Sequence, residues 1–233
     1  MRTTGPGQRP AAGPGQKALE TPRAAGLAGI VFGLLLAAAI VLMRLGIPQG
    51  ADAVTAQGFE DSTRRGVVQA ALRLVPFAGI FFLWFVGAVR AHVGEAEDKF
   101  LATVLLGSGL VFTATMFGAA AAAWGVLAVA YPPGSSPALA AWNFGRHFAY
   151  TLMIGYAMRM AAVFTCSMSV IGHRLGVLPR WLTLLGFLTA VILLFVAPSV
   201  PWSELVFPAW TLVLGTHIFV ENGRNRSRAA AAG

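Results

Sequence analysis

Charged residues are scarce in this sequence. Only 11% of its 233 residues are Asp, Glu, Lys or Arg, and 57% are hydrophobic. Soluble globular domains average about 25% charged and about 45–50% apolar residues. So little charge cannot supply the polar surface that a water-soluble fold of this size needs, and the mean hydropathy of +0.70 agrees. The composition therefore excludes an ordinary soluble domain and predicts a membrane protein.

Cysteine is almost absent as well. The single residue, Cys166, lies in an apolar stretch. No disulfide can form within the chain, so cysteine usage does not indicate an oxidising or a reducing compartment. We expect Cys166 to be a small buried side chain rather than a nucleophile.

The common motifs of metal and catalytic sites are also missing. The sequence contains no HExxH, no CxxC, no GxSxG and no glycine-rich phosphate loop. We therefore predict no metal site, no cofactor and no catalytic residues. The sequence does not favour an enzyme.

Long apolar stretches, in contrast, follow one another along the chain. A helix of about 20 apolar residues crosses a membrane core about 30 Å thick. We predict an all-α bundle of six transmembrane helices, in one domain over residues 24–221, between a disordered tail (1–23) and a basic tail (222–233). The spans are expected at residues 24–43, 67–89, 100–130, 148–171, 181–197 and 204–220.

The connection between the third and fourth predicted spans has a distinct composition. Residues 131–136 read Tyr-Pro-Pro-Gly-Ser-Ser, which is typical of a turn. We expect the loop to continue to Arg146 and His147, so that the fourth span begins at Phe148.

The positions of Lys and Arg predict the orientation. If the N-terminus is cytoplasmic, only Arg44, Arg64, Arg65 and Arg146 of the 17 basic residues fall on the outer side. Most of the others lie in the tails and inner turns, as basic residues of multi-pass proteins usually do. We therefore predict a multi-pass protein of the cytoplasmic membrane with both termini in the cytoplasm.

The net charge of +8 has the same origin. It comes from tails and short loops, and no basic stripe alternates with aromatic residues as in nucleic-acid-binding proteins. We predict no nucleic-acid partner. The sequence does not indicate an oligomeric state.

Three stretches carry a resemblance to known proteins: residues 76–113 (beginning PFAGIFFLWFVGAVR), 143–169 (beginning NFGRHFAYTLMIGYAMR) and 178–187 (LPRWLTLLGF). Together they resemble a group of uncharacterised bacterial membrane proteins, chiefly actinobacterial, that belong to a broad six-helix family of unknown function. The resemblance covers most of residues 24–220. It implies a six-helix membrane protein, and it implies no activity and no functional residues.

Arg159 is the strongest candidate for a site inside a span. It lies near the middle of the fourth predicted span, where a charge costs at least about 2.5 kcal/mol. Two interpretations are open. In one, Arg159 and Tyr156 belong to an anion, headgroup or substrate site. In the other, the helix face packs and Arg159 bonds to backbone carbonyls or to a buried partner. The small and polar residues on the same helical face are Thr151, Gly155, Tyr156, Ala162, Cys166 and Ser169.

His217 lies at a similar predicted depth in the sixth span. Both spans run from outside to inside, so Arg159 and His217 could meet and together bind an anion or support a proton-coupled step. Alternatively, His217 is an isolated histidine near the inner interface.

Arg73 and Glu204 are predicted to be structural charges within the membrane domain. Both lie toward the outer ends of their spans, in the second and sixth helices. They either pair with each other or reach separately toward the lipid headgroups.

Glycine marks a further helix surface. Gly29 and Gly33 form a GxxxG pair in the first span, which is typical of close helix packing in membranes. Packing within the chain and dimerisation are both open.

Two function classes remain. The first is a non-enzymatic membrane protein that acts through contacts with membrane lipids or with another membrane protein of the cell envelope. The second is a small carrier or permease with an intramembrane site around Arg159. The sequence favours the first, because it requires only the packing faces and interfacial charges that are visible.

Overall fold

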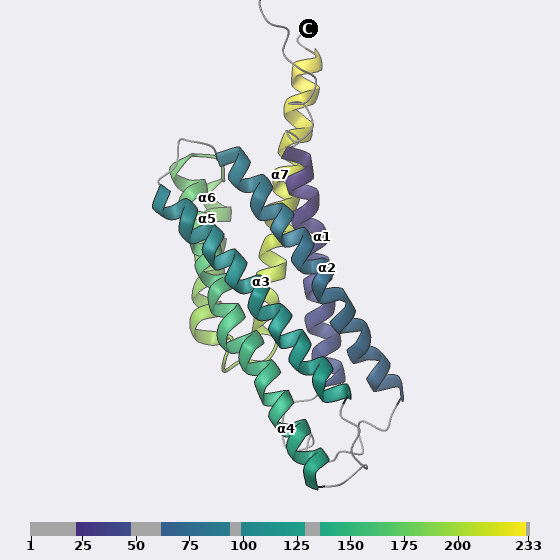
Figure 1. Cartoon of the computed structure of the whole chain (residues 1–233). Helices are drawn as coiled ribbons and strands as arrows, with labels where there is room; N and C mark the ends of the chain where they lie inside the picture. The colour runs from purple at the N-terminus through teal and green to yellow at the C-terminus, as the bar shows by residue number, and fades with distance from the viewer. Residues whose placement is uncertain (1–21, 48–61, 94–98, 129–135, 232–233) are drawn as a thin grey trace, which may run out of the picture.

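The protein is an all-α helical bundle, as its computed structural model shows (Figure 1). The structure describes residues 22–47, 62–93, 99–128 and 136–231, which contain no β-strand. The predicted fold class is confirmed. The elements in chain order are α1 (Pro22–Gly46), α2 (Ser62–Val93), α3 (Lys99–Ala128), α4 (Ser136–Tyr150), the π-helix η4 (Thr151–Ala157), α5 (Met158–Arg174), α6 (Arg180–Val191), the π-helix η5 (Ile192–Val196), the short 3-10 helix η6 (Ser203–Leu205) and α7 (Val206–Ala231).

The ends of the chain differ from the prediction where they are described. The predicted tail of residues 1–23 lies outside the described residues except for Pro22 and Arg23, which begin α1. At the other end α7 continues as one helix to Ala231, past the span end predicted at residue 220. The apolar run predicts which part of this helix spans the membrane, but it does not predict where the helix ends.

Within the residues that the structure describes, five helices have the length and the apolar composition of membrane spans. A sixth apolar helix is shorter, with 12 residues in α6 and 5 in η5. Each of the six predicted spans lies on one of these helices, and the chain is an integral membrane protein. The five long segments are Ala24–Gly46, Arg65–Arg90, Lys99–Gly125, Ala140–Arg174 and Ser203–Glu221.

The predicted loop up to Arg146 and His147 is wrong, because these residues lie within α4. The only proline of α4, Pro137, is the second residue of the helix, where it removes no intrahelical hydrogen bond. The residues that follow are rich in alanine, which has the highest helix propensity. The helix therefore begins ten residues before Arg146 and carries both charges near the end of α4.

α4, η4 and α5 form one continuous helix. Tyr150 and Met158, at the two ends of the π-helical segment, keep right-handed helical backbone angles. The Met158 amide donates to the Met153 carbonyl, five residues back, so the turn widens without breaking. At 1.5 Å per residue the whole helix is about 58 Å long, about twice the membrane core, and α4 projects from one end of the bundle (Figure 1).

Phenylalanine fills the centre of the bundle. Five helices each contribute a fully buried ring to one cluster, and neighbouring ring centroids lie 4.5 to 6.4 Å apart, mostly edge to face. Such contacts bring the helices to a defined separation. The rings are Phe32 of α1, Phe82 of α2, Phe112 of α3, Phe164 of α5 and Phe207 of α7.

Glycines allow α1 and α7 to touch along their backbones. A Cβ atom on Gly215 would lie 2.9 Å from the Gly26 carbonyl oxygen, and one on Gly26 would lie 2.8 Å from the Gly215 carbonyl oxygen. Gly29 faces Phe85 and Gly215, and Gly33 faces Leu212 on α7. The predicted GxxxG packing face thus packs within the chain, which leaves it covered rather than open to a second copy.

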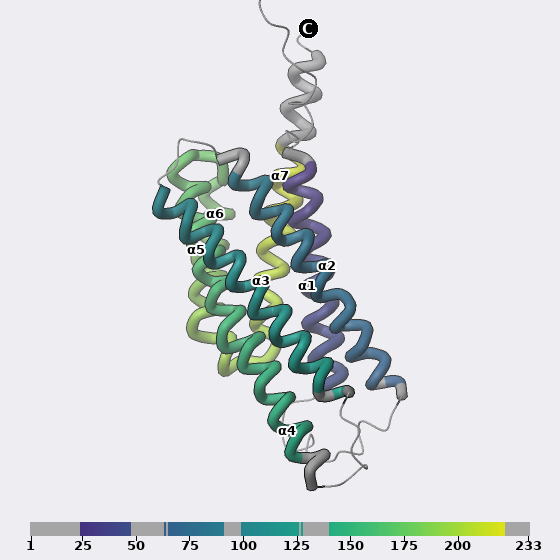
Figure 2. Tube along the Cα trace, viewed as in Figure 1, coloured from purple at the N-terminus to yellow at the C-terminus, as the bar shows by residue number. Residues whose placement is uncertain are grey.

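Different parts of the helices lie at the two ends of the bundle. The first turns of α1 lie beside the middle of α7, at Gly215 and Phe219, toward one end of the bundle (Figure 1 and Figure 2). The opposite end holds the last turn of α1, the projecting α4 and the turn that leads into α7 (Figure 1). We refer to this second end as the α4 end.

Candidate functional site

A buried ion pair lies at the α4 end. Arg44 Nε donates to Glu204 Oε1 at 2.5 Å, and the two side chains are 7% and 0% exposed. Arg44 stands in the last turn of α1, where the helix dipole favours a cation. Glu204 stands in η6, immediately before α7. The pair therefore joins two helices that also cross at their glycines.

Two aromatic rings face the same arginine. The Arg44 guanidinium carbon lies 5.9 Å from the centre of the Tyr150 ring and 5.8 Å from that of Trp202, within the range of cation–π attraction. The Tyr150 hydroxyl donates to the Ile47 carbonyl at 2.7 Å. Arg44 thus connects the end of α1, the end of α4 and the turn before α7. We call Arg44, Glu204, Tyr150 and Trp202 the arginine clamp.

Trp202 adopts a backbone conformation that is rare for a bulky residue. Its φ angle of 71° places it in the left-handed region, and no other described non-glycine residue has a positive φ. Such a conformation costs about 1–3 kcal/mol and persists where the surroundings hold it. Here it brings the indole ring to Arg44, so the clamp offsets the cost of the turn.

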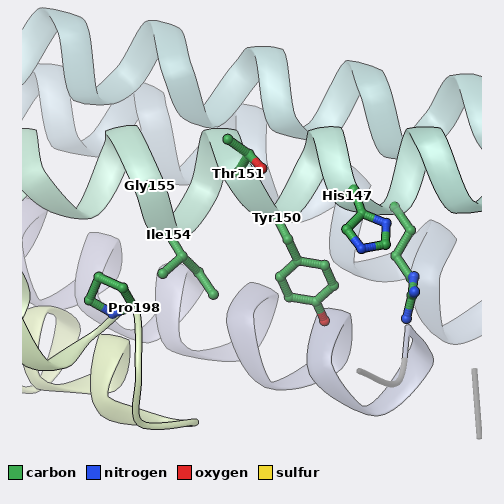
Figure 3. Close-up of a pocket in the computed structure, with 7 residues that line it drawn as sticks. His147, Tyr150, Thr151, Ile154, Gly155 and Pro198 are labelled. Atoms are coloured by element: carbon green, nitrogen blue, oxygen red, sulfur yellow. The ribbon is translucent and has the colours of Figure 1, made fainter. Parts of the chain in front are cut away.

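A cavity of about 500 Å³ opens beside the clamp (Figure 3). Figure 3 shows His147, Tyr150 and Ile154 pointing from the continuous α4–η4 helix toward the same side, with Pro198 opposite Ile154 on the turn before α7. The volume is within the range of small-molecule sites, about 300–1,000 Å³. The lining residues are Arg146, His147, Tyr150, Thr151, Ile154, Gly155 and Pro198.

The mouth of the cavity is basic. Arg146 and His147 line it, and none of the seven lining residues is acidic. His147 Nδ1 lies 2.8 Å from the Asn143 carbonyl oxygen, which can only accept, so Nδ1 carries the proton. Nε2 is then the ring nitrogen that remains for a ligand. The side chain is exposed, so a ligand can reach it.

One π-helical segment lines the cavity, and the other ends close to it in the sequence. η4 supplies Thr151, Ile154 and Gly155, and η5 ends two residues before Pro198. Single π-helical turns within α-helices are frequent at functional sites, because the extra residue changes which side chains share a face. In this protein the widened turn carries three of the seven lining residues.

The Arg159 side chain lies on the outer surface of the bundle, next to this cavity, and not in the bundle interior. Its side chain is exposed, and Nη1 donates to the carbonyl oxygen of Gly155, one turn back, which lines the cavity. Tyr156 is 58% exposed. The bond to a backbone carbonyl agrees with the second interpretation, whereas the exposed Arg159 and Tyr156 side chains do not form a packed face. A ligand site on Arg159 and Tyr156 stays a prediction.

His217 has different neighbours from Arg159. Its ring lies 6.3 Å from the Trp181 ring, and Nε2 lies 3.4 Å from Glu221 Oε2, one turn further along α7. The two atoms are close enough for an ion pair, but the contact does not have the geometry of a hydrogen bond. The described contacts do not bring His217 and Arg159 into one site.

Glu204 is a structural charge, but its partner is not the one considered from the sequence. It pairs with Arg44, while the Arg73 side chain is exposed. Arg44 was assigned to a loop because the apolar run stops at Met43, whereas α1 continues to Gly46. One signal was available: Glu204 is the only acidic residue between Lys99 and Glu221, so a basic partner near its own end of the bundle was required.

Within the described residues, no group of three or more His, Cys, Asp or Glu side chains is placed to hold a metal ion. Comparison of the chain with protein-family models, curated proteins and solved structures gives no match. The arguments for function therefore rest on the geometry of the chain itself.

Proposed function

We propose that the chain crosses the cytoplasmic membrane six times, with both termini in the cytoplasm and the α4 end outside. The two terminal helices reach the same end of the bundle, as an even number of crossings requires (Figure 1). The α4 end also carries Arg44 and Arg146, two of the few basic residues assigned to the outer side. The weakest span is α6 with η5, because together they reach only about 26 Å.

Cysteine labelling on either side of α6 tests this topology. Ser199 and Val177 are exposed residues in the turns that follow and precede α6. In a Cys166→Ala background we expect a membrane-impermeant maleimide to label Ser199→Cys in intact cells. Val177→Cys should react only after permeabilisation. Equal labelling of both positions in intact cells would show that α6 does not cross the membrane.

We propose further that the protein binds a membrane amphiphile, a lipid or lipid-like molecule, in the cavity at the α4 end. The observation that carries this proposal is the cavity itself, which places a basic mouth next to apolar groups on a membrane helix. Arg146 and His147 lie nearer the projecting end of the helix, and Ile154 and Gly155 lie about two turns deeper. This sequence of polar and then apolar groups matches an amphiphile at a membrane boundary.

The alternative function, a carrier with a central site, has less support. The central ring cluster is fully buried, with Phe82 and Phe32 at 4.5 Å between centroids. A second cavity, between Phe32 and Phe117, is only about 10 Å³, about the size of one water molecule. Because a transport path must open through this packed centre, the geometry favours binding over transport.

Filling the cavity tests the binding proposal. A Cβ atom on Gly155 meets only Thr151 Cγ2 at 3.6 Å and Arg159 Nη1 at 3.8 Å, so Gly155→Leu fits locally and sends its outer carbons into the cavity. We expect native mass spectrometry of the wild-type protein, extracted from its own membrane, to show a bound lipid mass. Gly155→Leu should lose most of it.

Gly87→Leu is the matched control. Gly87 is exposed on α2, and a Cβ atom there has no neighbour within 4 Å. This variant should retain the lipid mass of the wild type. Equal retention by Gly155→Leu, or absence of any discrete lipid from the wild type, would contradict the proposal.

A further inference from the structure

We infer that Arg159 binds the phosphate group of a bilayer phospholipid and draws that lipid inward along the outer surface of α5. This lipid is distinct from the amphiphile proposed for the cavity, because Arg159 does not line that cavity. Three features of Arg159 support the contact: its depth in the bundle, the direction of its side chain and the hydrogen-bond donors that the protein leaves unused.

The depth of Arg159 follows from the neighbours of Tyr150. The Tyr150 ring faces Arg44 at 5.9 Å, and Arg44 lies in the last turn of α1, where the apolar segment Ala24–Gly46 ends. Tyr150 therefore lies level with the polar end of a membrane helix. Arg159 follows nine residues later in the same continuous helix, up to about 14 Å further from the α4 end (Figure 1). Its backbone is therefore level with the apolar parts of the spans.

The Arg159 side chain points back toward the α4 end. It is exposed on the outer surface of the bundle, and Nη1 donates to the carbonyl oxygen of Gly155, one turn nearer that end. Gly155 is five residues from Tyr150, so the guanidinium lies up to about 8 Å deeper than the Tyr150 level. Long basic side chains take this direction when they reach from a membrane helix toward the headgroups.

Most of the hydrogen-bonding capacity of Arg159 remains for a ligand. A guanidinium carries only donors, and Gly155 accepts a bond from one of its nitrogens. No acidic side chain among the described residues forms an ion pair with Arg159. A charge inside a span is costly, and inward movement of headgroups and water, with local thinning of the bilayer, lowers that cost.

A lipid phosphate matches these donors better than water alone. The planar guanidinium donates two parallel hydrogen bonds to two oxygens of one phosphate, and such charge-assisted bonds are about twice as strong as neutral ones. Every phospholipid carries this group, whether its whole headgroup is neutral or anionic. A lipid is favoured over a free anion, because a free anion has no apolar chain to hold it at this depth and is expensive to move away from bulk water.

Fluorescence quenching in bilayers tests the contact. The full-length Cys166→Ala protein carries a fluorophore on Tyr156→Cys, a 58% exposed position three residues from Arg159, in phosphatidylcholine vesicles. A small share of the lipid carries a nitroxide, either on the headgroup or near the end of an acyl chain. The ratio of quenching by the two lipids measures the depth of the fluorophore below the phosphates. With Arg159 present we expect the headgroup nitroxide to quench more strongly.

Substitutions at Arg159 separate charge from structure. Arg159→Met should let the phosphates return to the Tyr150 level, so that the measured depth of the fluorophore increases by up to about 8 Å. Arg159→Gln should do the same, because glutamine can donate to the Gly155 carbonyl but carries no charge. Arg159→Lys should keep the shallow depth, because an ammonium group attracts phosphate as a point charge. The matched control, Arg73→Met at an exposed arginine of α2, should change nothing.

The possible results lead to different conclusions. An unchanged depth in Arg159→Met would overturn the phosphate contact, and so would a shift that Arg159→Gln does not reproduce, because the bond to Gly155 would then explain it. Quenching by water-soluble acrylamide without quenching by the headgroup nitroxide would mean that water alone reaches Arg159, which also overturns the contact. None of these results changes the lipid mass lost in Gly155→Leu, so the proposed function is tested separately.

Discussion

Replacing Arg44 by methionine should lower the free energy of unfolding by about 3–5 kcal/mol, the cost typical of removing one partner of a buried ion pair. The substitution leaves the Glu204 carboxylate completely buried without its counter-charge. It also removes the cation that Tyr150 and Trp202 face. Unfolding by sodium dodecyl sulfate in mixed micelles measures the change.

A double variant tests whether the two charges stabilise the fold as a pair. Arg44→Met with Glu204→Leu removes both charges, and Glu204 Oε2 has no hydrogen-bond partner in the native pair. We therefore expect the double variant to recover more than half of the loss seen in Arg44→Met. Arg73→Met, at an exposed arginine of the same membrane domain, should change stability by less than about 0.5 kcal/mol. Additive effects of the two clamp substitutions would show that the pair does not act as a unit.

Valine at Gly215 should strongly destabilise the bundle. The added Cβ would lie 2.9 Å from the Gly26 carbonyl oxygen and 2.9 Å from the Ile30 amide nitrogen. Both are backbone atoms, so no side-chain rotation relieves the overlap and α1 must move away from α7. We expect a loss of about 3 kcal/mol, the upper part of the usual cost of overpacking, in the same micellar unfolding measurement.

Gly87→Val is the control for this substitution. It adds the same β-branched side chain to a membrane helix at a position with no atom within 4 Å. Its effect should stay below about 1 kcal/mol. A Gly215→Val protein as stable as Gly87→Val would mean that the close crossing of α1 and α7 does not hold the bundle together.

The helical bundle could be predicted from the sequence because each apolar run indicates a helix at that place in the chain, whatever the distant residues are. The charge content and six runs were enough for an all-α membrane fold, and the glycine spacing at Gly29 and Gly33 indicated a packing face. The helix that packs against that face, α7, is far from it in the sequence. The last helix has two glycines, Gly215 and Gly223, which are eight residues apart and form no GxxxG pair, so no glycine motif in the sequence predicts the crossing with α1.

The cavity could not be predicted for a related reason. Its lining depends on α4 being helical and on the π-helical turn at Thr151–Ala157, which shifts the faces that follow it. A regular helix of 3.6 residues per turn grouped Arg159 with Gly155 and Thr151, and all three do lie together. The regular helix did not predict that this face lies on the outside of the bundle, next to the cavity.

Photo-crosslinking in native membranes tests the lipid site most directly. A photoreactive residue is placed at Thr151, in the cavity, or at Leu184, a 68% exposed residue of α6 that samples the surrounding bilayer. We predict that Thr151 yields adducts of one lipid class, enriched over the adducts from Leu184. Adducts with the same lipid composition at both positions would show that the cavity selects no lipid, and would contradict the proposed function.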